Sequence, residues 1–193
     1  RDAANDRQDR VLLRPAVRLL LIIHHRRRPM DTTPYNILFL CTGNSARSIL
    51  AEGLMNQLSE GRFRAFSAGS QPMGRVNPVA LETLEKLGCD ASGMSSKSWD
   101  VFADADAPKM DFVITVCDSA AGEACPYWPG TPMTAHWGFP DPSHVEGDDE
   151  ARRNAFAKTA QAISHRLRLF LSLPMDKLDQ LSLQRELRSI GSA

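Results

Sequence analysis

The feature that most constrains the fold is a run of four apolar residues, Ile37–Leu40, which ends at Cys41 and leads through a short loop into a helix-like segment, Ser48–Met55. An unbroken apolar run of this kind is typical of a strand buried on both faces of a parallel sheet. In open α/β sheets, ligands bind just beyond the carboxyl ends of the strands. Cys41 therefore stands where chemistry is expected.

The loop after this strand has the composition of an anion-binding site. A loop that enters a helix directs unpaired N–H groups at a ligand, and the helix dipole favours an anion there. The same field lowers the pKa of a cysteine from about 8.5 into a range of about 3.5 to 7.5, so we expect Cys41 to be a thiolate nucleophile. Arg47 offers a planar fork of donors that matches a tetrahedral oxyanion, and Ser48 can donate its hydroxyl to the sulfur. The expected oxyanion-binding residues are Thr42, Gly43, Asn44, Ser45, Ala46 and Arg47.

The simpler interpretation is a buried cysteine at a strand end with an unrelated arginine nearby, because a bare Cys-x5-Arg spacing often occurs by chance. The order of strand, cysteine, Gly-Asn turn, arginine, serine and helix is far more specific. We therefore favour the anion-binding nucleophile.

The rest of the chain alternates between strand and helix patterns. Strands separated by helices imply right-handed crossovers and a parallel sheet. We predict an α/β fold with a doubly wound, four-stranded parallel sheet, helices on both faces and an extra C-terminal helix. The further expected strands are 63–67, 112–116 and 133–137, and the further expected helices are 77–88, 98–105 and 149–171.

Three regions follow from the pattern. We expect residues 1–30 to form a basic, largely disordered leader, residues 31–173 the catalytic domain, and residues 174–193 an amphipathic helix. Met30 would make a natural start, which favours a leader from upstream translation or added sequence; a short helix on a membrane surface is the alternative. The apolar run 17–23 is far shorter than the ~20 residues of a membrane span. The apolar stripe of the tail must be covered by the core, which we favour, or by a partner.

Charge and cysteine content narrow the function class. Residues 1–30 carry eight arginines and three aspartates, and because the whole chain has no net charge, the remainder is mildly acidic. An acidic domain argues against a nucleic-acid-binding surface. Four cysteines in 193 residues do not indicate a secreted disulfide framework. We therefore expect a cytoplasmic protein with catalytic or redox thiols.

Cys117 and Cys125 flank a short segment rich in alanine and glycine. Cys117 follows the strand 112–116 and should lie at the same edge of the sheet as Cys41. The deformable Cys-x7-Cys segment suits thiols that approach each other during turnover. The alternative is a zinc site, but the spacing does not match the usual Cys-x2–4-Cys pattern. Its ligands would be Cys117, Cys125, His136 and His144.

Asp141 precedes Pro142 on a turn after the strand 133–137, again at the carboxyl edge of the sheet. A carboxyl group there can act as general acid to the leaving oxygen while Cys41 attacks. The alternative is an aspartate that only caps a turn. With Cys41 and Arg47 expected at the same edge, we favour the general acid.

From about Tyr35 to Leu171 the chain resembles the low-molecular-weight protein tyrosine phosphatases and, within that fold, the arsenate reductases that couple to thioredoxin. The matching motifs are Cys41–Ser48, Ser67–Gly69, Val76–Pro78, Val116-Cys117 with Cys125-Pro126, and His136–Gly138 with Asp141-Pro142.

This resemblance implies a three-cysteine relay. Cys41 attacks arsenate while Arg47 and the loop amides hold the oxyanion, and Asp141 protonates the departing oxygen. Cys117 then attacks Cys41, which releases arsenite and leaves a Cys41–Cys117 disulfide. Cys125 attacks Cys117 in turn, and an external thioredoxin or a glutaredoxin/glutathione system reduces the Cys117–Cys125 disulfide. No bound cofactor is implied, and phosphate or sulfate should mimic arsenate.

The chain departs from the family pattern in two places that favour a reductase. Ala46 stands where the phosphatases usually have a second loop cysteine, and Ser143 stands where they have a tyrosine after Asp-Pro. The segment between Cys117 and Cys125 is one residue longer than in the best-known reductases, which leaves the identity of the reductant open.

A third departure concerns metal binding. Some reductases of this kind hold potassium through the equivalents of Asn44, Glu52 and Ser67, together with an aspartate. Lys97 stands at the aspartate position, and its ammonium group would replace the cation, so we predict no metal.

The prediction from sequence is therefore an arsenate reductase. One alternative is a low-molecular-weight protein tyrosine phosphatase that hydrolyses phosphotyrosine or small phosphomonoesters, for which Cys41 is the only thiol needed. Another is a non-enzymatic thiol redox sensor, which would need neither Arg47 nor Asp141.

Overall fold

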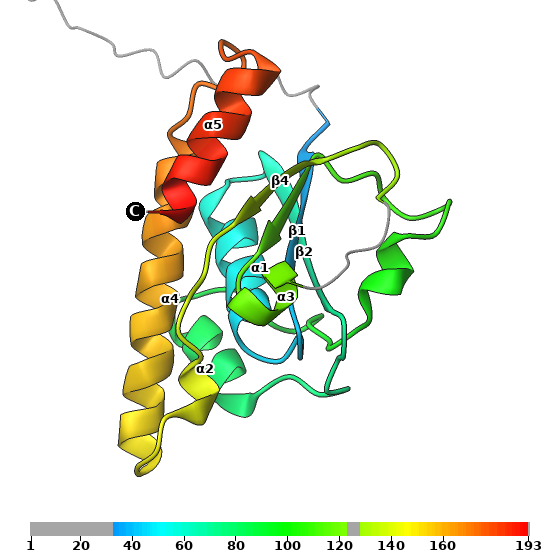
Figure 1. The fold of residues 1–193 in the computed structure, drawn as a ribbon. Helices are drawn as coiled ribbons and strands as arrows, with labels where there is room; N and C mark the ends of the chain where they lie inside the picture. The colour runs from blue at the N-terminus through cyan, green and yellow to red at the C-terminus, as the bar shows by residue number, and fades with distance from the viewer. Residues whose placement is uncertain (1–32, 123–127, 193) are drawn as a thin grey trace, which may run out of the picture. The chain divides into compact units, whose positions relative to one another are not determined.

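The centre of the fold is a four-stranded parallel sheet in the order β2-β1-β3-β4 (Figure 1). The structure is a computed structural model that describes residues 33–122 and 128–192; the expected leader and Cys125 lie outside these residues. Because every strand runs in the same direction, all four carboxyl ends meet at one edge, as the sequence predicts. The strands are β1 (Tyr35–Cys41), β2 (Phe63–Gly69), β3 (Phe112–Thr115) and β4 (Met133–His136).

The helices agree with the sequence patterns except in two short segments and in the tail, where the helix expected over 174–193 begins only at Gln180. The helix expected over 98–105 is only a four-residue 3-10 helix, η1 (Trp99–Phe102), which begins where the Ser98 side chain accepts a hydrogen bond from the Asp100 amide. The segment after Cys117, expected as a deformable loop, begins with the short helix α3 (Asp118–Gly122). The other helices are α1 (Arg47–Leu58), α2 (Pro78–Lys86), η2 (Pro142–His144), α4 (Asp149–Leu171) and α5 (Gln180–Gly191).

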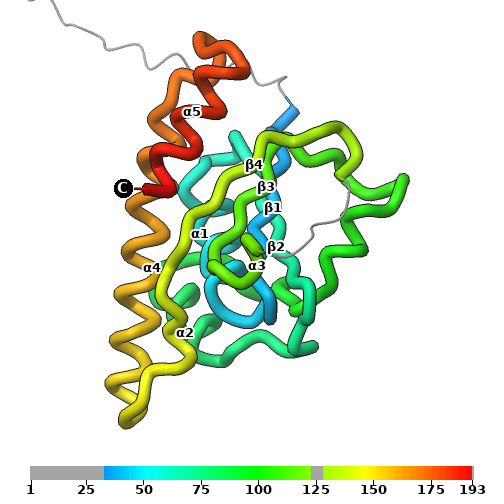
Figure 2. Tube along the Cα trace, in the orientation of Figure 1, coloured from blue at the N-terminus to red at the C-terminus, as the bar shows by residue number. Residues whose placement is uncertain are grey.

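The two faces of the sheet are covered by different elements (Figure 2). Ile37 and Phe39 of β1 point into the larger apolar cluster, which contains buried residues of α1, α2, α4 and α5. Leu38 and Leu40 point to the opposite face and join a smaller cluster with Phe102 of η1. This alternation is the two-residue period of a strand buried on both faces. The expected α/β fold is confirmed, with the long helices gathered on one face.

The C-terminal helix α5 packs against β4 and α4, the arrangement that we favoured for the tail (Figure 1). Its apolar stripe is buried against the core through Leu183, Leu187 and Ile190. Two hydrogen bonds fix its position: the Trp137 indole donates to the Leu187 carbonyl at 3.0 Å, and the Gln184 amide donates to the Thr134 carbonyl at 2.7 Å. Within the described ranges, no helix is both long and apolar enough to cross a membrane.

Candidate active site

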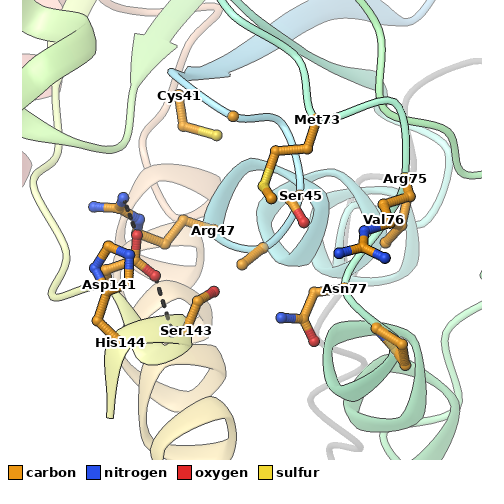
Figure 3. Close-up of a pocket in the computed structure, with 13 residues that line it drawn as sticks. Cys41, Ser45, Arg47, Met73, Arg75, Val76, Asn77, Asp141, Ser143 and His144 are labelled. Atoms are coloured by element: carbon orange, nitrogen blue, oxygen red, sulfur yellow. Dashed lines mark hydrogen bonds and ion pairs between the residues drawn. The ribbon is translucent and has the colours of Figure 1, made fainter.

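Cys41, the last residue of β1, lines a pocket with a volume of about 480 Å³ at the carboxyl edge of the sheet (Figure 3). Three segments that are distant in the sequence contribute to this pocket: the loop after β1, the segment that leads into α2, and the segment after β4. Besides Cys41, the lining residues are Gly43, Ser45, Ala46, Arg47, Met73, Arg75, Val76, Asn77, Pro78, Asp141, Ser143 and His144.

The loop after β1 is held in shape by hydrogen bonds between its carbonyl groups and backbone amides of the segment between β2 and α2. The Thr42 carbonyl accepts from the Gln71 amide at 2.9 Å, the Gly43 carbonyl from the Met73 amide at 3.0 Å, and the Ser45 carbonyl from the Asn77 amide at 2.9 Å. Asn44 takes a positive φ of 42°, which glycine and asparagine tolerate best. With these carbonyls bonded to the segment between β2 and α2, the Asn44 amide donates to Cys41 Sγ at 3.1 Å.

The first turn of α1 has the donors that an anion requires. Ala46 is its N-cap and provides no side-chain cap. Among the described residues, the amides of Ser45, Ala46 and Arg47 have no hydrogen-bond acceptor. A buried helix N-terminus left without partners is unfavourable unless an anion or water binds it. The geometry therefore fits the expected oxyanion cradle, although two residues expected in it, Thr42 and Asn44, do not line the pocket.

Asn44 lies behind the loop and supports the nucleophile through Ser48. The backbone amide of Lys97 can only donate, so its 2.8 Å contact identifies the Asn44 Oδ1 atom as the acceptor. The Asn44 Nδ2 group then donates to Ser48 Oγ at 2.9 Å. Ser48 Oγ also lies 2.9 Å from Cys41 Sγ, and because a thiolate can only accept, Ser48 is the donor once Cys41 is ionised. The structure thus agrees with the expected role of Ser48 as a donor to the sulfur.

Burial raises the pKa of the Cys41 thiol above its ordinary value, and the nearby Cys117 adds to this rise. Hydrogen bonds from Ser48 and from the Asn44 amide, which lies 3.1 Å from the sulfur, oppose it. The lowered pKa expected from the helix dipole is therefore not found in this structure, because desolvation disfavours the thiolate more strongly. It follows that the reactivity of Cys41 depends on its hydrogen-bond donors and on an anion-binding loop around it.

We expect Ser48→Ala to raise the pKa of Cys41 by about one unit, because a hydrogen bond to a charged group is worth ~1.5–3 kcal/mol and one pKa unit corresponds to ~1.4 kcal/mol. Alkylation of Cys41 by iodoacetamide, followed by peptide mapping, should then reach half its plateau rate at a higher pH than in the wild type. Ser67→Ala is the matched control, since Ser67 is the other acceptor of the Asn44 amide but makes no hydrogen bond to the sulfur. An unchanged midpoint in Ser48→Ala would contradict this assignment.

Arg47 and Asp141 form an ion pair at the pocket. Arg47 Nη2 lies 2.6 Å from Asp141 Oδ2, and Nη1 donates to the Phe139 carbonyl at 3.1 Å. The other carboxylate oxygen of Asp141 accepts from the Ser143 amide at 2.9 Å, which starts η2. Asp141 therefore caps the turn, as one interpretation expected, and it also lies beside Arg47 in the pocket of Cys41; its role as general acid stays a prediction.

The second thiol, Cys117, follows β3 and is buried, with an exposed fraction of 2%. Its sulfur lies 3.7 Å from Thr42 Oγ1, directly beside the loop that follows Cys41, and it accepts from the Ala120 amide at 3.4 Å. The parallel sheet brings Cys41 and Cys117 to one edge, as expected. Cys125, the third expected thiol, is outside the described residues.

The residues singled out for metal binding form a hydrogen-bonded cluster behind the loop. Ser67 Oγ accepts from Asn44 Nδ2 at 2.9 Å and donates to Glu52. Burial raises the pKa of Glu52 above its ordinary value, and the hydrogen bond from Ser67 and the charge of Lys97 offset only part of this rise. The Lys97 ammonium group itself donates to the Ser95 carbonyl at 3.0 Å. In the part of the chain that the structure describes, no three histidine, cysteine, aspartate or glutamate residues form a group that could hold a metal ion.

The histidines considered for a zinc site are in different surroundings. The His136 ring lies between Thr115 Oγ1, at 2.9 Å, and Asp118 Oδ1, at 3.0 Å. His144 instead lines the oxyanion pocket, beside Asp141.

Sequence reasoning missed two other side chains that line this pocket, Met73 and Arg75. Both belong to the segment between β2 and α2, which has no helical or strand periodicity and therefore gave no structural signal. The one indication was their position just before the Val76–Pro78 motif.

Comparison with known proteins matches the chain to a phosphatase family and shows its similarity to arsenate reductases. Residues 36–187 match the family model of low molecular weight phosphotyrosine protein phosphatases. An arsenate reductase from Halalkalibacterium halodurans is 37% identical over 134 residues, which cover 69% of this chain and 93% of the relative; one from Bacillus subtilis is 36% identical with the same coverage. A solved arsenate reductase in the reduced state superposes with a TM-score of 0.57 at 27% identity, over 72% of this chain and 97% of that one. A thioredoxin-dependent arsenate reductase from Corynebacterium glutamicum gives a TM-score of 0.50 at 25% identity, over 72% of this chain and 60% of that one.

Proposed function

This chain belongs to the low-molecular-weight phosphotyrosine protein phosphatase family, and from that premise we propose that it is an arsenate reductase. The observation that carries the proposal is the second buried thiol, Cys117, beside the oxyanion loop. Hydrolysis of a phosphoester needs a nucleophile, an oxyanion cradle and an acid, but no second thiol. Relatives at 36–37% identity that are named arsenate reductases support the same choice.

In the first step, the Cys41 thiolate attacks the arsenic atom of arsenate. The loop amides and Arg47 hold the remaining oxygens, where negative charge increases in the transition state. As the oxyanion displaces Asp141 from Arg47, the freed carboxylate takes up a proton from solvent and transfers it to the departing oxygen, which leaves as water. The product is a covalent adduct between the Cys41 sulfur and arsenic in its pentavalent state.

In the second step, the Cys117 thiolate attacks the Cys41 sulfur. The sulfur–arsenic bond breaks and its electron pair stays on arsenic, so arsenate becomes arsenite while two thiols become a Cys41–Cys117 disulfide. Cys125 then attacks the Cys117 sulfur, which frees the Cys41 thiolate and leaves a Cys117–Cys125 disulfide. An external dithiol of the thioredoxin type reduces this disulfide, and the cytoplasm, where such reductants keep thiols reduced, is the compartment that this chemistry suits.

Two features of the pocket bear on the alternatives. The residues that line it within the described ranges include no phenylalanine, tyrosine or tryptophan, so the pocket offers no aromatic wall for a phosphotyrosine ring. The paired Arg47 and Asp141 would be unnecessary in a thiol sensor that only reports oxidation. Phosphatase activity on small phosphomonoesters is therefore a side reaction of the same machinery.

The decisive experiment is an arsenate-dependent assay of NADPH consumption with the full chain. Thioredoxin with its reductase, and glutaredoxin with glutathione and its reductase, are supplied in separate reactions. We expect consumption that requires both arsenate and the thioredoxin system. Hydrolysis of an aryl phosphate without any arsenate-dependent consumption would instead assign the chain to the phosphatases.

We expect Asp141→Asn to slow arsenate reduction by about 10²–10⁴-fold, the usual contribution of a general acid. Binding of the oxyanion should be retained or strengthened, because the change removes the carboxylate that pairs with Arg47 at 2.6 Å. Steady-state rates and protection of Cys41 from alkylation by phosphate measure the two effects separately. A weakened affinity with an intact rate would show that Asp141 is not the acid.

A further inference from the structure

Arg75 is an arginine of the oxyanion pocket that the mechanism does not use. It lies in the segment between β2 and α2 and is exposed. Figure 3 shows its guanidinium group extending toward the pocket from the side opposite Arg47 and Asp141. Among the described residues, Arg75 makes no hydrogen bond and no ion pair with a carboxylate. It therefore contributes nothing visible to holding the fold together.

The backbone holds Arg75 in place over the loop. The Met73 amide donates to the Gly43 carbonyl at 3.0 Å, and the Asn77 amide donates to the Ser45 carbonyl at 2.9 Å. Arg75 stands midway between these two attachments. Gly74, with a φ of 70° and open space around it, allows the chain to turn between them. The base of the Arg75 side chain is therefore fixed although its guanidinium is free to move.

The charges of the residues that line the pocket indicate a role for Arg75 in binding an anion. Arg47 is neutralised by Asp141 at 2.6 Å, so the cation beside the nucleophile is already paired when an oxyanion arrives. Apart from this pair, the residue with a permanent charge among those that line the pocket is Arg75. Unpaired charges at the mouth of a pocket attract an oppositely charged ligand and raise its local concentration.

We propose that Arg75 is a substrate-binding residue that captures the oxyanion at the pocket mouth, before Arg47 exchanges its carboxylate partner for the substrate. This role rests on the proposed function, since it assumes a tetrahedral oxyanion as the substrate. Arg75 acts on capture and not on the transfer of electrons, so it should affect KM for arsenate while leaving kcat close to that of the wild type. A side chain with a purely structural role would not produce this separation.

The test uses inorganic phosphate as an unreactive probe. Phosphate that occupies the pocket should protect Cys41 from iodoacetamide, and the half-protecting concentration measures binding without requiring turnover. We expect Arg75→Gln to raise this concentration by about three- to fivefold, the scale of an exposed ion pair, and KM for arsenate by a similar factor. Arg75→Lys should restore most of the affinity. The difference between Arg75→Gln and the wild type should shrink at high salt, because exposed charges are then screened.

Arg188→Gln is the matched control, because it removes the same charge from an exposed position in the last turn of α5, outside the pocket. A shift in Arg188→Gln as large as that in Arg75→Gln would overturn the proposal in favour of a general effect of net charge. If phosphate protects Cys41 at the same half-protecting concentration in the wild type and in Arg75→Gln, the capture role of Arg75 is overturned and the oxyanion site is not. Phosphate that fails to protect the wild type would overturn the oxyanion site itself. Normal protection without arsenate reduction would remove only the proposed reaction and leave the capture role supported.

Discussion

Replacing Cys41 with serine should abolish both arsenate reduction and any hydrolysis of aryl phosphates, with losses of about 10⁴-fold or more. A hydroxyl has a pKa far above neutrality and cannot replace a thiolate, even with the Ser48 donor 2.9 Å away. Arsenate-dependent NADPH consumption and release of p-nitrophenol measure the two activities.

The Cys41→Ser protein should still fold, because the substitution changes one buried atom and keeps the hydrogen bond to Ser48. A thermal melt that phosphate shifts upward, as in the wild type, would show that the fold and the oxyanion loop are intact. Retention of either activity near the wild-type rate would remove Cys41 from the role of nucleophile.

Cys117→Ser and Cys125→Ser should each stop multiple-turnover arsenate reduction but spare hydrolysis of a small aryl phosphate, because hydrolysis needs only Cys41, Arg47 and Asp141. The two variants should stop at different stages. Without Cys117, no thiol beside the oxyanion loop can resolve the adduct between Cys41 and arsenic. Without Cys125, one equivalent of arsenite should be released and a Cys41–Cys117 disulfide should accumulate, which peptide mapping after alkylation would detect.

Cys89→Ser is the matched control for these variants. Cys89 is also a buried thiol, but its sulfur donates to Gln57 at 2.8 Å and does not line the oxyanion pocket. Its replacement should leave turnover unchanged. Undiminished arsenate turnover in Cys125→Ser, with both Cys41 and Cys117 freely alkylated, would refute the relay and restore the phosphatase interpretation.

The parts of the site that could be predicted are those that a single local segment or the sheet topology determines. Cys41, Arg47 and Ser48 belong to one strand–loop–helix unit, so their proximity follows from the chain itself. Cys117 and Asp141 follow other parallel strands, and parallel strands bring their carboxyl ends together at one edge. Local sequence is enough to predict the first group, and the common direction of the strands is enough to predict the second.

The parts that could not be predicted depend on contacts between segments without periodicity. The direction of the pKa shift at Cys41 is set by burial, which arises only when the whole core has packed around the strand end. The approach of Arg75 depends on two backbone hydrogen bonds between the loop after β1 and the segment before α2. The pairing of Arg47 with Asp141 likewise needs the exact path of the chain after β4, which no spacing rule gives.

The packing of α5 against β4 protects this protein from self-association. β4 is an outer strand of the sheet, and an uncovered outer strand is a template on which another molecule can add its own strand. The side-chain amide of Gln184 donates a hydrogen bond to the outward-facing Thr134 carbonyl of β4. Gly191 lies so close to the His136 carbonyl that no larger residue would fit at this position. A chain shortened before residue 180 would lose this cover and present Thr134 and the neighbouring backbone to solvent. Such a fragment would be liable to self-association through intermolecular strand pairing, even with every residue of the oxyanion pocket still in place.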